Sequence, residues 1–295
     1  MNKNEILDLA IIGSGPAAMS AAIYASRAKL KTVVFERETI GGKLGVIHYI
    51  ENYPGYMGAG QELAEKMRDA AERFGAIFRY GECTDIDKVD DIFSLRIDDE
   101  DILAKKILIA VGTEHKKLDI PGEELERVSY CATCDAPLTE NKSVIVIGSG
   151  NAAVQECFSV LNYCRDVTLL VHHQLKCDEY LKDKIKSETR VKIIEDFEAE
   201  KIAETEDELK IISKDGKNFK ASYIFVFIGN QPATAFLPKE ILADNGEIIV
   251  NKNGETSISG LFAAGDCVNG AIKQVVTATG MGATAALKIK KDLDS

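Results

Sequence analysis

Two stretches of the chain repeat one pattern of apolar and small residues. Residues 7–37 read LDLAIIGSGPAAMSAAIYASRAKLKTVVFER, which is an apolar run, a glycine turn, a series of small residues and a second apolar run. Residues 143–173 read SVIVIGSGNAAVQECFSVLNYCRDVTLLVHH and follow the same order. Apolar runs on either side of a small-residue helix predict a strand, a helix and a second, parallel strand. The repeat therefore predicts two nucleotide-binding folds in one chain.

The other apolar runs indicate how these two folds are joined. Residues 106–123 predict a strand that leads into a crossover with glycine and proline, and residues 223–238 predict a matching return. Residues 260–293 predict a strand, a turn and a long amphipathic helix that completes the first fold. We therefore expect an α/β protein with two Rossmann-like nucleotide-binding domains, the second inserted in the first. The expected domains are 1–115 with 246–295, and 116–245.

Composition and charge narrow the classes of protein. The 295 residues are 45% hydrophobic and 28% charged, which is typical of a globular protein with two medium-sized cores. A net charge of -11 argues against nucleic-acid binding, and the acidic run at 195–210 predicts a solvated hairpin. No apolar run reaches the ~18 residues of a membrane span, and the stretch MNKNEILDLA leads into a strand rather than resembling a signal peptide. We expect a cytoplasmic protein with neither a nucleic-acid nor a membrane partner.

The first glycine turn has the chemistry of a dinucleotide site. Gly13, Gly15 and Ala18 occupy the three fingerprint positions, which provide a tight turn, space for a pyrophosphate against the backbone, and close packing of helix on strand. Glu36 stands at the end of the following strand, where a carboxylate accepts hydrogen bonds from ribose hydroxyls. This combination predicts a bound dinucleotide.

The second glycine turn lacks the residue that usually meets the ribose. Gly148, Gly150 and Ala153 fill the same three positions, but the next strand runs into the sequence HHQLK at 172–176. Neither an acid, which holds free ribose hydroxyls, nor an arginine, which holds a 2'-phosphate, is present there. The retained glycines have another explanation, because they also serve strand-to-helix packing.

The sequence YCATCDAP at 130–137 predicts a redox pair. If a helix begins there, Cys131 and Cys134 lie one turn apart, and Pro137 is tolerated only in a first turn. A helix N-terminus lowers the pKa of a thiol, and the thiolate is the attacking species in disulfide exchange. Asp135 is positioned to move the proton that a leaving thiolate needs, although a helix-capping role is the alternative.

The other cysteines leave a zinc site as an alternative to redox chemistry. Cys157, Cys164, Cys177, His172 or His173 would have to complete it, but no second closely spaced pair of ligands is present except the adjacent histidines. We therefore expect no metal. Buried, unreactive thiols are expected at four further positions, whereas Cys177 stands among charged residues and is expected to be exposed. The four are Cys83, Cys157, Cys164 and Cys267.

The motifs together resemble the low-molecular-weight flavoprotein thioredoxin reductases. The matching stretches are GSGPAA at 13–18, ERETIGGKL at 36–44, ENYPG at 51–55, IAVGT at 109–113, CATCD at 131–135 and AAGDCVNGAIKQ at 263–274. The resemblance implies a homodimer that reduces thioredoxin, with FAD held by the first domain and the redox pair carried on the inserted one. It implies that Cys134 faces the flavin, that Cys131 attacks the thioredoxin disulfide and that Asp135 is the acid-base partner.

The same resemblance assigns the residues around FAD. The glycine turn would hold the pyrophosphate, Glu36 the adenosine ribose, and Asp266 the region of the ribityl chain and phosphates. Lys273 stands where the family usually has arginine, so it keeps the positive charge without the guanidinium fork. The implied cofactor-binding residues are Gly13, Ser14, Gly15, Pro16, Ala17, Glu36, Gly41, Gly42, Lys43, Leu44, Asn52, Gly112, Asp266, Lys273, Gln274 and Val275.

The electron donor is where the sequence departs from most of the family. NADPH-dependent members carry a run like HRRxxxR where this chain has HHQLKCD at 172–178. Each lost arginine removes charge-assisted contacts worth ~1.5–3 kcal/mol. The chain is thus most similar to the ferredoxin-linked flavin thioredoxin reductases, and we expect ferredoxin as the donor. Ferredoxins are acidic, so docking needs a basic patch, for which the candidates are Lys29 with Lys31, Lys105 with Lys106, and Lys116 with Lys117.

Other functions stay open from the sequence. One is an NADPH-dependent thioredoxin reductase with an atypical phosphate site, in which Lys176 contributes to phosphate binding. Another is an FAD-dependent dithiol oxidase, in which thiols reduce the flavin and oxygen reoxidises it. A third is a zinc-stapled nucleotide-binding module without catalysis.

Overall fold

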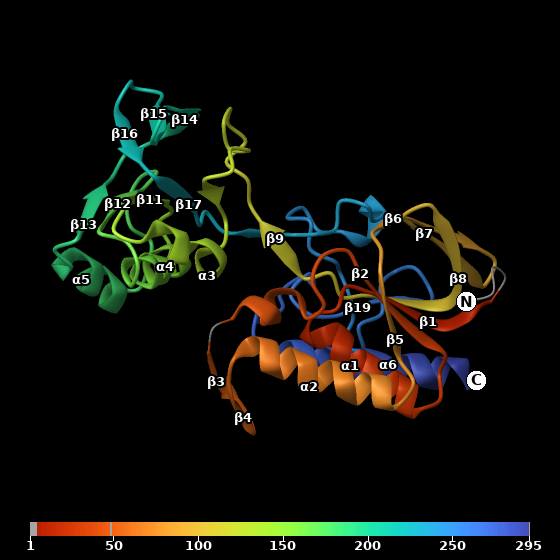
Figure 1. Ribbon diagram of the computed structural model, residues 1–295. Helices are drawn as coiled ribbons and strands as arrows, with labels where there is room; N and C mark the ends of the chain where they lie inside the picture. The colour runs from red at the N-terminus through yellow and green to blue at the C-terminus, as the bar shows by residue number, and fades with distance from the viewer. Residues whose placement is uncertain (1–4, 48, 295) are drawn as a thin grey trace. The chain divides into compact units, whose positions relative to one another are not determined.

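The computed structural model describes residues 5–47 and 49–294, which form two compact units (Figure 1). The first four residues of the N-terminal stretch considered above lie outside this description. The first unit takes the chain up to Glu114 and again from Gln231, and the second unit is His115–Asn230. The return crossing thus lies at 230/231, whereas the sequence led us to expect it at 245/246. Residues 231–245 join the first unit because Leu237 and Ile241 are buried in its core.

The first unit combines a mixed sheet with three long helices. Its strands are β1 (Leu7–Ile12), β2 (Thr32–Glu36), β3 (Ile50–Tyr53), β4 (Tyr56–Gly58), β5 (Ile77–Tyr80), β6 (Cys83–Val89), β7 (Ile92–Ile97), β8 (Glu100–Ile109) and β19 (Leu261–Ala263). Its helices are α1 (Pro16–Arg27), α2 (Gly60–Arg73) and α6 (Val275–Leu293), with short 3-10 turns η1 (Gly42–Val46) and η3 (Lys239–Ile241).

The sheet of the first unit has the strand order β5-β2-β1-β8-β7-β6, and β19 also pairs with β8. β1 pairs in parallel with β2 and β8, and β2 in parallel with β5, which confirms the strand-helix-strand pattern predicted from the sequence. β8 is long enough for its first half to pair antiparallel with β7 and its last residues to pair in parallel with β19. The late strand β19 therefore completes a sheet begun by β1.

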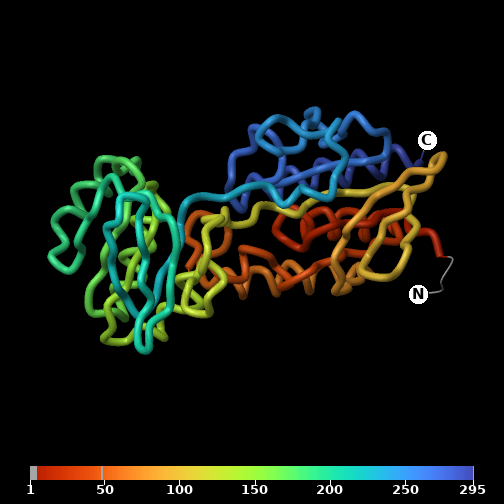
Figure 2. Tube along the Cα trace, turned by 90° about the horizontal axis from the view of Figure 1, so that it is seen from above, coloured from red at the N-terminus to blue at the C-terminus, as the bar shows by residue number. Residues whose placement is uncertain are grey.

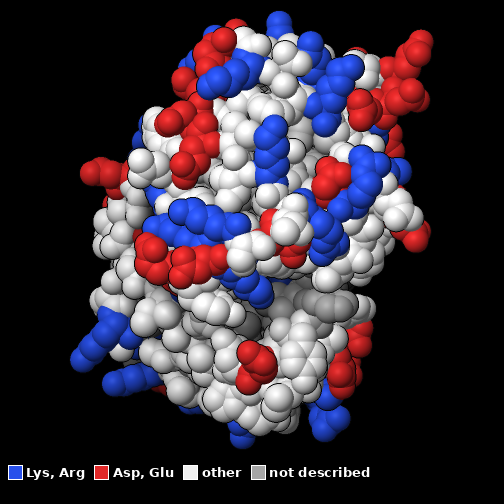
Figure 3. All heavy atoms as spheres, turned by 90° about the vertical axis from the view of Figure 1, so that its left-hand side faces the viewer, with Lys and Arg blue, Asp and Glu red and all other residues white. Residues whose placement is uncertain are grey.

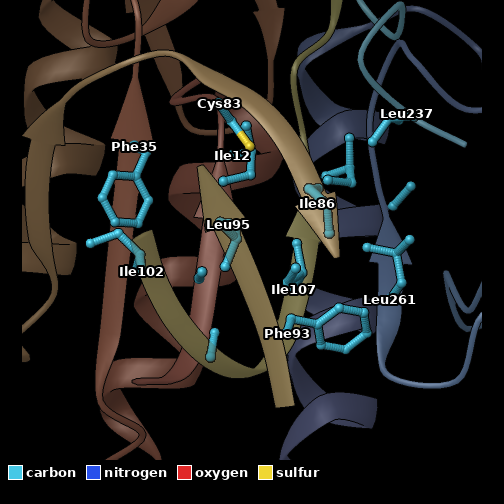
Figure 4. Packing of buried hydrophobic residues seen from close by; sticks show 14 of the residues in the cluster. Ile12, Phe35, Cys83, Ile86, Phe93, Leu95, Ile102, Ile107, Leu237 and Leu261 are labelled. Carbon is cyan, nitrogen blue, oxygen red and sulfur yellow. The ribbon is translucent and has the colours of Figure 1, made fainter. Parts of the chain in front are cut away.

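Alternate residues of β1 enter two different cores. Leu9 and Ile11 face α1 and α6, where buried alanines let helices and sheet approach closely. Ala10 and Ile12 face a second cluster, in which β6, β7 and the segment around Leu237 cover the opposite face (Figure 4). Full burial of a side chain of leucine or isoleucine size stabilises a fold by about 1.5–3 kcal/mol, so both faces contribute substantially.

The second unit is a smaller parallel sheet with helices on one face. Its strands are β10 (Val128–Ser129), β11 (Ser143–Ile147), β12 (Asp166–Leu170), β13 (Val191–Ile194), β14 (Ala199–Glu204), β15 (Leu209–Ser213), β16 (Asn218–Ala221) and β17 (Tyr223–Val226). Its helices are α3 (Ala132–Asp135), α4 (Asn151–Leu161) and α5 (Glu179–Ser187), with the 3-10 turn η2 (Ala136–Thr139).

The strand order β10-β17-β11-β12-β13 is parallel throughout and confirms a second Rossmann-like fold. On one face Val144 and Val146 pack with α4 and α5, and on the other Ile145 and Ile147 pack with the antiparallel sheet β14-β15-β16. The acidic run 195–210 supplies β14 and the start of β15, so its prediction as a hairpin is confirmed.

The chain crosses between the units twice, through β9 (Thr113–His115) and β18 (Asn230–Pro232), which pair with each other (Figure 2). Across residues 5–47 and 49–294, none of the helices combines the length and the apolar character needed to traverse a lipid bilayer.

Candidate functional site

The first glycine turn, between β1 and α1, is shaped for an anionic group. Gly13 has φ +94°, and a Cβ there would lie 2.5 Å from the main-chain oxygen of Ala110, so only glycine fits. Gly15 caps α1 without a side-chain hydrogen bond, and a Cβ added to it would meet nothing within 4 Å. Pro16 begins the helix and Ala17 is buried behind it. The open N-terminus of this 12-residue helix therefore fits a pyrophosphate.

Glu36 is tied to this turn through Ser14. Its Oε2 accepts hydrogen bonds from the Ser14 main-chain N–H at 3.0 Å and from Ser14 Oγ at 2.7 Å. Ser14 is fully buried, and its Oγ accepts from the Gly41 N–H at 2.9 Å. The Glu36 Oε1 accepts from the Glu38 N–H at 2.9 Å. One network thus fixes the turn, the end of β2 and the segment that starts at Gly41.

The segment at residues 41–44 contributes a half-buried cation. Lys43 Nζ donates a hydrogen bond to Thr113 Oγ1 at 2.7 Å. Burial lowers the pKa of Lys43 despite the opposing field of Asp266, and burial raises the pKa of Asp266 despite Lys43 and Lys273. A negative and a positive group are thus held in a partly dehydrated environment. Gly112 stands next to Thr113, and its main-chain oxygen accepts from the Ala233 N–H at 3.4 Å.

The same region includes the N-terminus of α6. Asn52 Nδ2 donates to Gln274 Oε1 at 3.1 Å, which joins β3 to the cap of α6, and Val275 is the first residue of that helix. Lys273 Nζ lies 3.1 Å from Glu247 Oε1 in an ion pair. Thr113 and Glu247 were not predicted from the sequence, although Thr113 stands within the IAVGT stretch. Gly42 and Leu44 lie in η1, and the Leu44 side chain is buried against Met19 and Ile50.

The redox pair forms a disulfide in a single helical turn. Cys131 is the N-cap of α3 and is bonded to Cys134, which is the more exposed of the two. Cys131 Sγ accepts from the Cys134 N–H at 3.2 Å, a contact that stabilises negative charge on this sulfur. Pro137 lies in the first turn of η2 rather than in the helix that begins at the cysteines, because α3 ends at Asp135. This arrangement fits dithiol-disulfide exchange.

Asp135 ends α3 and occupies the N-cap position of η2, but its side chain makes no capping hydrogen bond there. Its Oδ2 instead accepts from Ser129 Oγ at 2.6 Å. Ser129 was not predicted from the sequence, and it is the buried residue of the two-residue strand β10, in which Val128 is only partly buried.

The second glycine turn keeps its shape for packing. A Cβ on Gly148, which has φ +153°, would lie 2.4 Å from the main-chain oxygen of Phe227, whereas Gly150 faces open space. The packing explanation therefore accounts for Gly148 without any ligand.

The end of β12 carries histidines that face acids. His172 Nε2 lies 4.0 Å from Glu198 Oε1, and His173 Nδ1 lies 3.9 Å from Asp196 Oδ1. Both histidines are exposed, with side-chain exposures of 60% and 67%. Glu195 also points here, since its Oε1 accepts from the Leu175 N–H at 3.3 Å. Carboxylates from the segment after β13 thus occupy the region where a 2'-phosphate would require cations, and the sequence analysis had not brought them together.

The remaining cysteines are buried, which confirms the expectation for four of them and corrects it for one. Cys177 is only 4% exposed, because its side chain points into the core around α4 while the charged neighbours point outward. Burial raises the pKa of Cys83 to about 12, of Cys164 to about 11 and of Cys267 to about 12. These thiols are poor nucleophiles at neutral pH. Within the described ranges, no group of three or more His, Cys, Asp or Glu side chains is arranged to hold a metal ion.

Comparison with known proteins agrees with this chemistry. Residues 7–282 match the family model described as pyridine nucleotide-disulphide oxidoreductase. A thioredoxin reductase of Treponema pallidum (strain Nichols) is 37% identical over 291 residues, with 95% of this chain and 94% of the relative covered. The structure of Lactococcus lactis thioredoxin reductase (FR conformation) shares 34% identity with a TM-score of 0.86, over 97% and 98% of the two chains. A ferredoxin-flavin thioredoxin reductase from Clostridium acetobutylicum shares 30% identity with a TM-score of 0.56, over 98% of both chains.

Proposed function

This chain belongs to the pyridine nucleotide-disulphide oxidoreductase family, and from that premise we propose that it is a thioredoxin reductase supplied with electrons by reduced ferredoxin. Its cofactor is FAD, as in the family. Bound FAD would supply the redox chemistry that links the donor to the disulfide of Cys131 and Cys134. The relatives named thioredoxin reductase support thioredoxin as the substrate protein, and the neighbour named ferredoxin-flavin thioredoxin reductase supports ferredoxin as the donor.

The first unit supplies the groups that hold FAD. The open N-terminus of α1 at Gly15 takes the pyrophosphate, and Glu36, already oriented by Ser14, meets the adenosine ribose. Lys43 and Asp266 offer half-buried charges to the rest of the cofactor. The proposed set is Gly13, Ser14, Gly15, Pro16, Ala17, Glu36, Gly41, Gly42, Lys43, Leu44, Asn52, Gly112, Asp266, Lys273, Gln274 and Val275.

The second unit supplies the exchange chemistry. The Cys131 thiolate attacks the thioredoxin disulfide, and the Cys134 thiolate then attacks the resulting mixed disulfide at Cys131. The main-chain N–H of Cys134 stabilises the charge on the Cys131 sulfur, and Asp135 carries the proton that the leaving thiol requires. Two electrons thereby pass from the pair to thioredoxin.

One observation carries the choice of donor: the end of β12 presents His172 and His173 to carboxylates instead of presenting arginines to a phosphate. Asp196 and Glu198 would repel the 2'-phosphate of NADPH. They are also engaged by the histidines, and Glu198 by Lys214 at 2.5 Å, so they are poorly placed to hold the free hydroxyls of NADH.

Anaerobic reduction of the oxidised flavoprotein tests this choice. NADPH, NADH and reduced ferredoxin are added separately, flavin bleaching is followed at 450 nm, which is roughly the absorption maximum of an oxidised flavin, and thioredoxin reduction is the downstream measurement. We expect bleaching by ferredoxin alone, followed by thioredoxin reduction. Rapid bleaching by micromolar NADPH would mean that the second glycine turn binds nucleotide.

Lys176 favours that alternative, an NADPH-dependent enzyme with an atypical phosphate site. Its main-chain N–H donates to the Ser149 oxygen at 2.8 Å, so this exposed lysine lies beside the second glycine turn. An FAD-dependent dithiol oxidase is the other alternative. Oxygen consumption with a small dithiol, without reduction of thioredoxin, would identify it.

Ferredoxin docking needs a local excess of positive charge, and the candidate lysines differ in this respect. Lys31 forms an ion pair with Glu5, and Lys105 Nζ lies 2.7 Å from Asp8 Oδ1, so both are largely neutralised. On the face drawn in Figure 3, basic and acidic side chains are interspersed. Lys117 instead lies over the ring of Tyr130, beside Lys116, and we propose these two as the docking lysines. The homodimer and the cytoplasmic location stay predictions, which light scattering and cell fractionation test.

A further inference from the structure

Ser129 is the last residue of β10 and stands two residues before the redox pair. It is 6% exposed, and its hydroxyl has two partners within the redox turn. Ser129 Oγ lies 2.6 Å from Asp135 Oδ2 and 3.0 Å from the main-chain nitrogen of Cys131. A main-chain nitrogen can only donate, so the hydroxyl oxygen accepts from Cys131. One serine therefore links the attacking cysteine to the acid-base residue.

The single hydroxyl proton has two possible acceptors. Ser129 Oγ is also 3.2 Å from the main-chain oxygen of Cys131, but the contact to the Asp135 carboxylate is shorter. Hydrogen bonds to an ionised carboxylate are shorter and stronger than those to a neutral carbonyl, so the proton is donated to Asp135. The carboxylate is thereby held in one orientation by its Oδ2.

The other carboxylate oxygen of Asp135, Oδ1, is not used in a hydrogen bond to the described part of the protein. Within the described part of the chain, the Asp135 carboxylate has Ser129 as its only hydrogen-bond partner, so Oδ1 accepts no hydrogen bond from protein. The Asp135 N–H donates to the Cys131 main-chain oxygen at 3.2 Å, which fixes the backbone of the same turn. The position of Oδ1 therefore depends on the hydrogen bond that Ser129 makes to Oδ2.

We propose that Ser129 is a positioning residue for disulfide exchange, which holds the Asp135 carboxylate and the Cys131 main chain in one rigid turn. A proton from a thiol of the pair moves to Asp135 Oδ1. The Cys131 thiolate forms a bond with one substrate sulfur, the substrate S–S bond breaks, and the departing thiolate takes the proton from Oδ1. The Cys134 thiol then gives its proton to Oδ1, its thiolate forms the Cys131–Cys134 bond as the mixed disulfide breaks, and the departing second substrate thiolate takes that proton from Oδ1. Two electrons and two protons reach the substrate.

The inference rests on the proposed disulfide-reductase function. Measurements with two different substrates distinguish a failure of the inference from a failure of the proposed function. The holoenzyme is reduced with dithiothreitol, freed of reductant without air, and mixed with either 5,5'-dithiobis(2-nitrobenzoate) or oxidised thioredoxin. Stopped-flow rates are measured from about pH 6 to pH 9, on either side of an ordinary thiol pKa. We expect Ser129→Ala to slow exchange about 10-fold and to flatten the pH profile, and Ser129→Thr, which keeps the hydroxyl, to restore most of the rate.

A double variant separates positioning from general structural damage. Asp135→Asn should slow exchange by about 100-fold, and adding Ser129→Ala should then have little further effect. Independent, additive losses in the double variant would overturn the proposal. If Ser129→Ala does not fold, Asp135→Glu makes the same test, because the longer side chain displaces the carboxylate from its bond to Ser129. A wild-type rate and pH profile for Asp135→Glu would also overturn it.

Ser213 provides a matched control within the same unit. It is 1% exposed, and its Oγ donates to Asp215 at the β15–β16 turn, away from the redox turn in the fold. Ser213→Ala should therefore leave both the exchange rate and its pH profile unchanged, and an equal slowing would overturn the inference. If the small disulfide gives the expected pattern and thioredoxin is not reduced at all, the role of Ser129 stands and the proposed function fails.

Discussion

In β1–α1–β2 the strand after the helix ends at Glu36, whereas in β11–α4–β12 it runs into His172 and His173. Both units keep a first glycine that would clash with neighbouring backbone if replaced, and a second glycine that faces open space. Yet Glu36 is held by hydrogen bonds from Ser14 in the glycine turn, while the histidines face acids of their own fold. The glycines of such a turn thus indicate how closely a strand packs against a helix. The residues at the end of the next strand indicate whether a nucleotide can bind.

The largest difference should appear in FAD affinity when Gly15 and Gly150, the two glycines that face open space, are each replaced by alanine. Gly15→Ala causes no internal clash but places a methyl group where the pyrophosphate approaches the backbone, so FAD affinity should fall by about 100-fold or more. Gly150→Ala, the matched change, should leave FAD content and ferredoxin-driven turnover within about twofold of wild type. Flavin absorbance after purification and thermal unfolding by circular dichroism measure this. A marked loss of turnover in Gly150→Ala would show that the second turn does bind a ligand.

Arginines introduced at the end of β12 should produce the next largest effect. His172→Arg with His173→Arg supplies two guanidinium groups, each worth ~1.5–3 kcal/mol toward a phosphate. Asp196 and Glu198 would compete for them, so Asp196→Asn with Glu198→Gln completes the change. Flavin bleaching by NADPH should become about 10- to 100-fold faster in the quadruple variant, without a matching gain for NADH. If NADPH gains nothing, the strand end is not what distinguishes the two turns.

Charge reversal at the proposed docking lysines should have a smaller effect, confined to the donor step. Lys116→Glu with Lys117→Glu should lower the rate of flavin reduction by ferredoxin about 10-fold at low salt, and the difference should shrink as salt screens the charges. Lys184→Glu with Lys186→Glu, on α5 of the same unit, is the control for net charge. Equal losses in both variants would mean that docking depends on overall charge alone.

The smallest expected effect is the change with pH in the stability that two carboxylates contribute, one in each unit. Hydrogen bonds from Lys288 and Asn251 lower the pKa of Glu255 to about 2, and hydrogen bonds from Lys217 and Ser213 lower that of Asp215 to about 2. A depressed pKa stabilises the fold above the unfolded pKa near 4.5 and loses that contribution as pH falls toward 2. Because Glu255 is partly exposed, Glu255→Gln should cost only about 1 kcal/mol at pH 7.

The Glu255→Gln cost should disappear near pH 2, and urea unfolding at both pH values measures it. Asp215→Asn should change stability less, since its ion pair is exposed to solvent. A larger loss at pH 2 than at pH 7 would contradict the sign of this assignment.

Local patterns made much of the fold predictable. Both strand-helix-strand units, the acidic hairpin and the redox turn follow from residues close together in sequence, where periodicity and turn chemistry act directly. The position of Glu36 was predictable for the same reason, because the end of a strand after a glycine turn has a fixed place.

Contacts between distant segments were not predictable. Thr113 meets Lys43 from 70 residues away, and Asp196 and Glu198 reach the histidines only because β13 lies next to β12. Cys177 was wrongly predicted to be exposed because its sequence neighbours are charged. Successive side chains point in different directions, so a buried cysteine can stand between charged residues. The return crossing was placed too late because only the packing of residues 231–245 against distant strands, through Leu237 and Ile241, assigns them to the first unit.

Because one unit is inserted within the other, the two units complete their folding at different times during synthesis. During synthesis, the contiguous stretch His115–Asn230 emerges whole before β19 and α6 exist, so the redox-active unit can fold early. The first unit must wait with β8 lacking β19 and α1 lacking α6. In the nascent chain, the unit that carries Cys131 and Cys134 is therefore folded while the cofactor-binding unit is still incomplete. Flavin binding then becomes the last step of maturation.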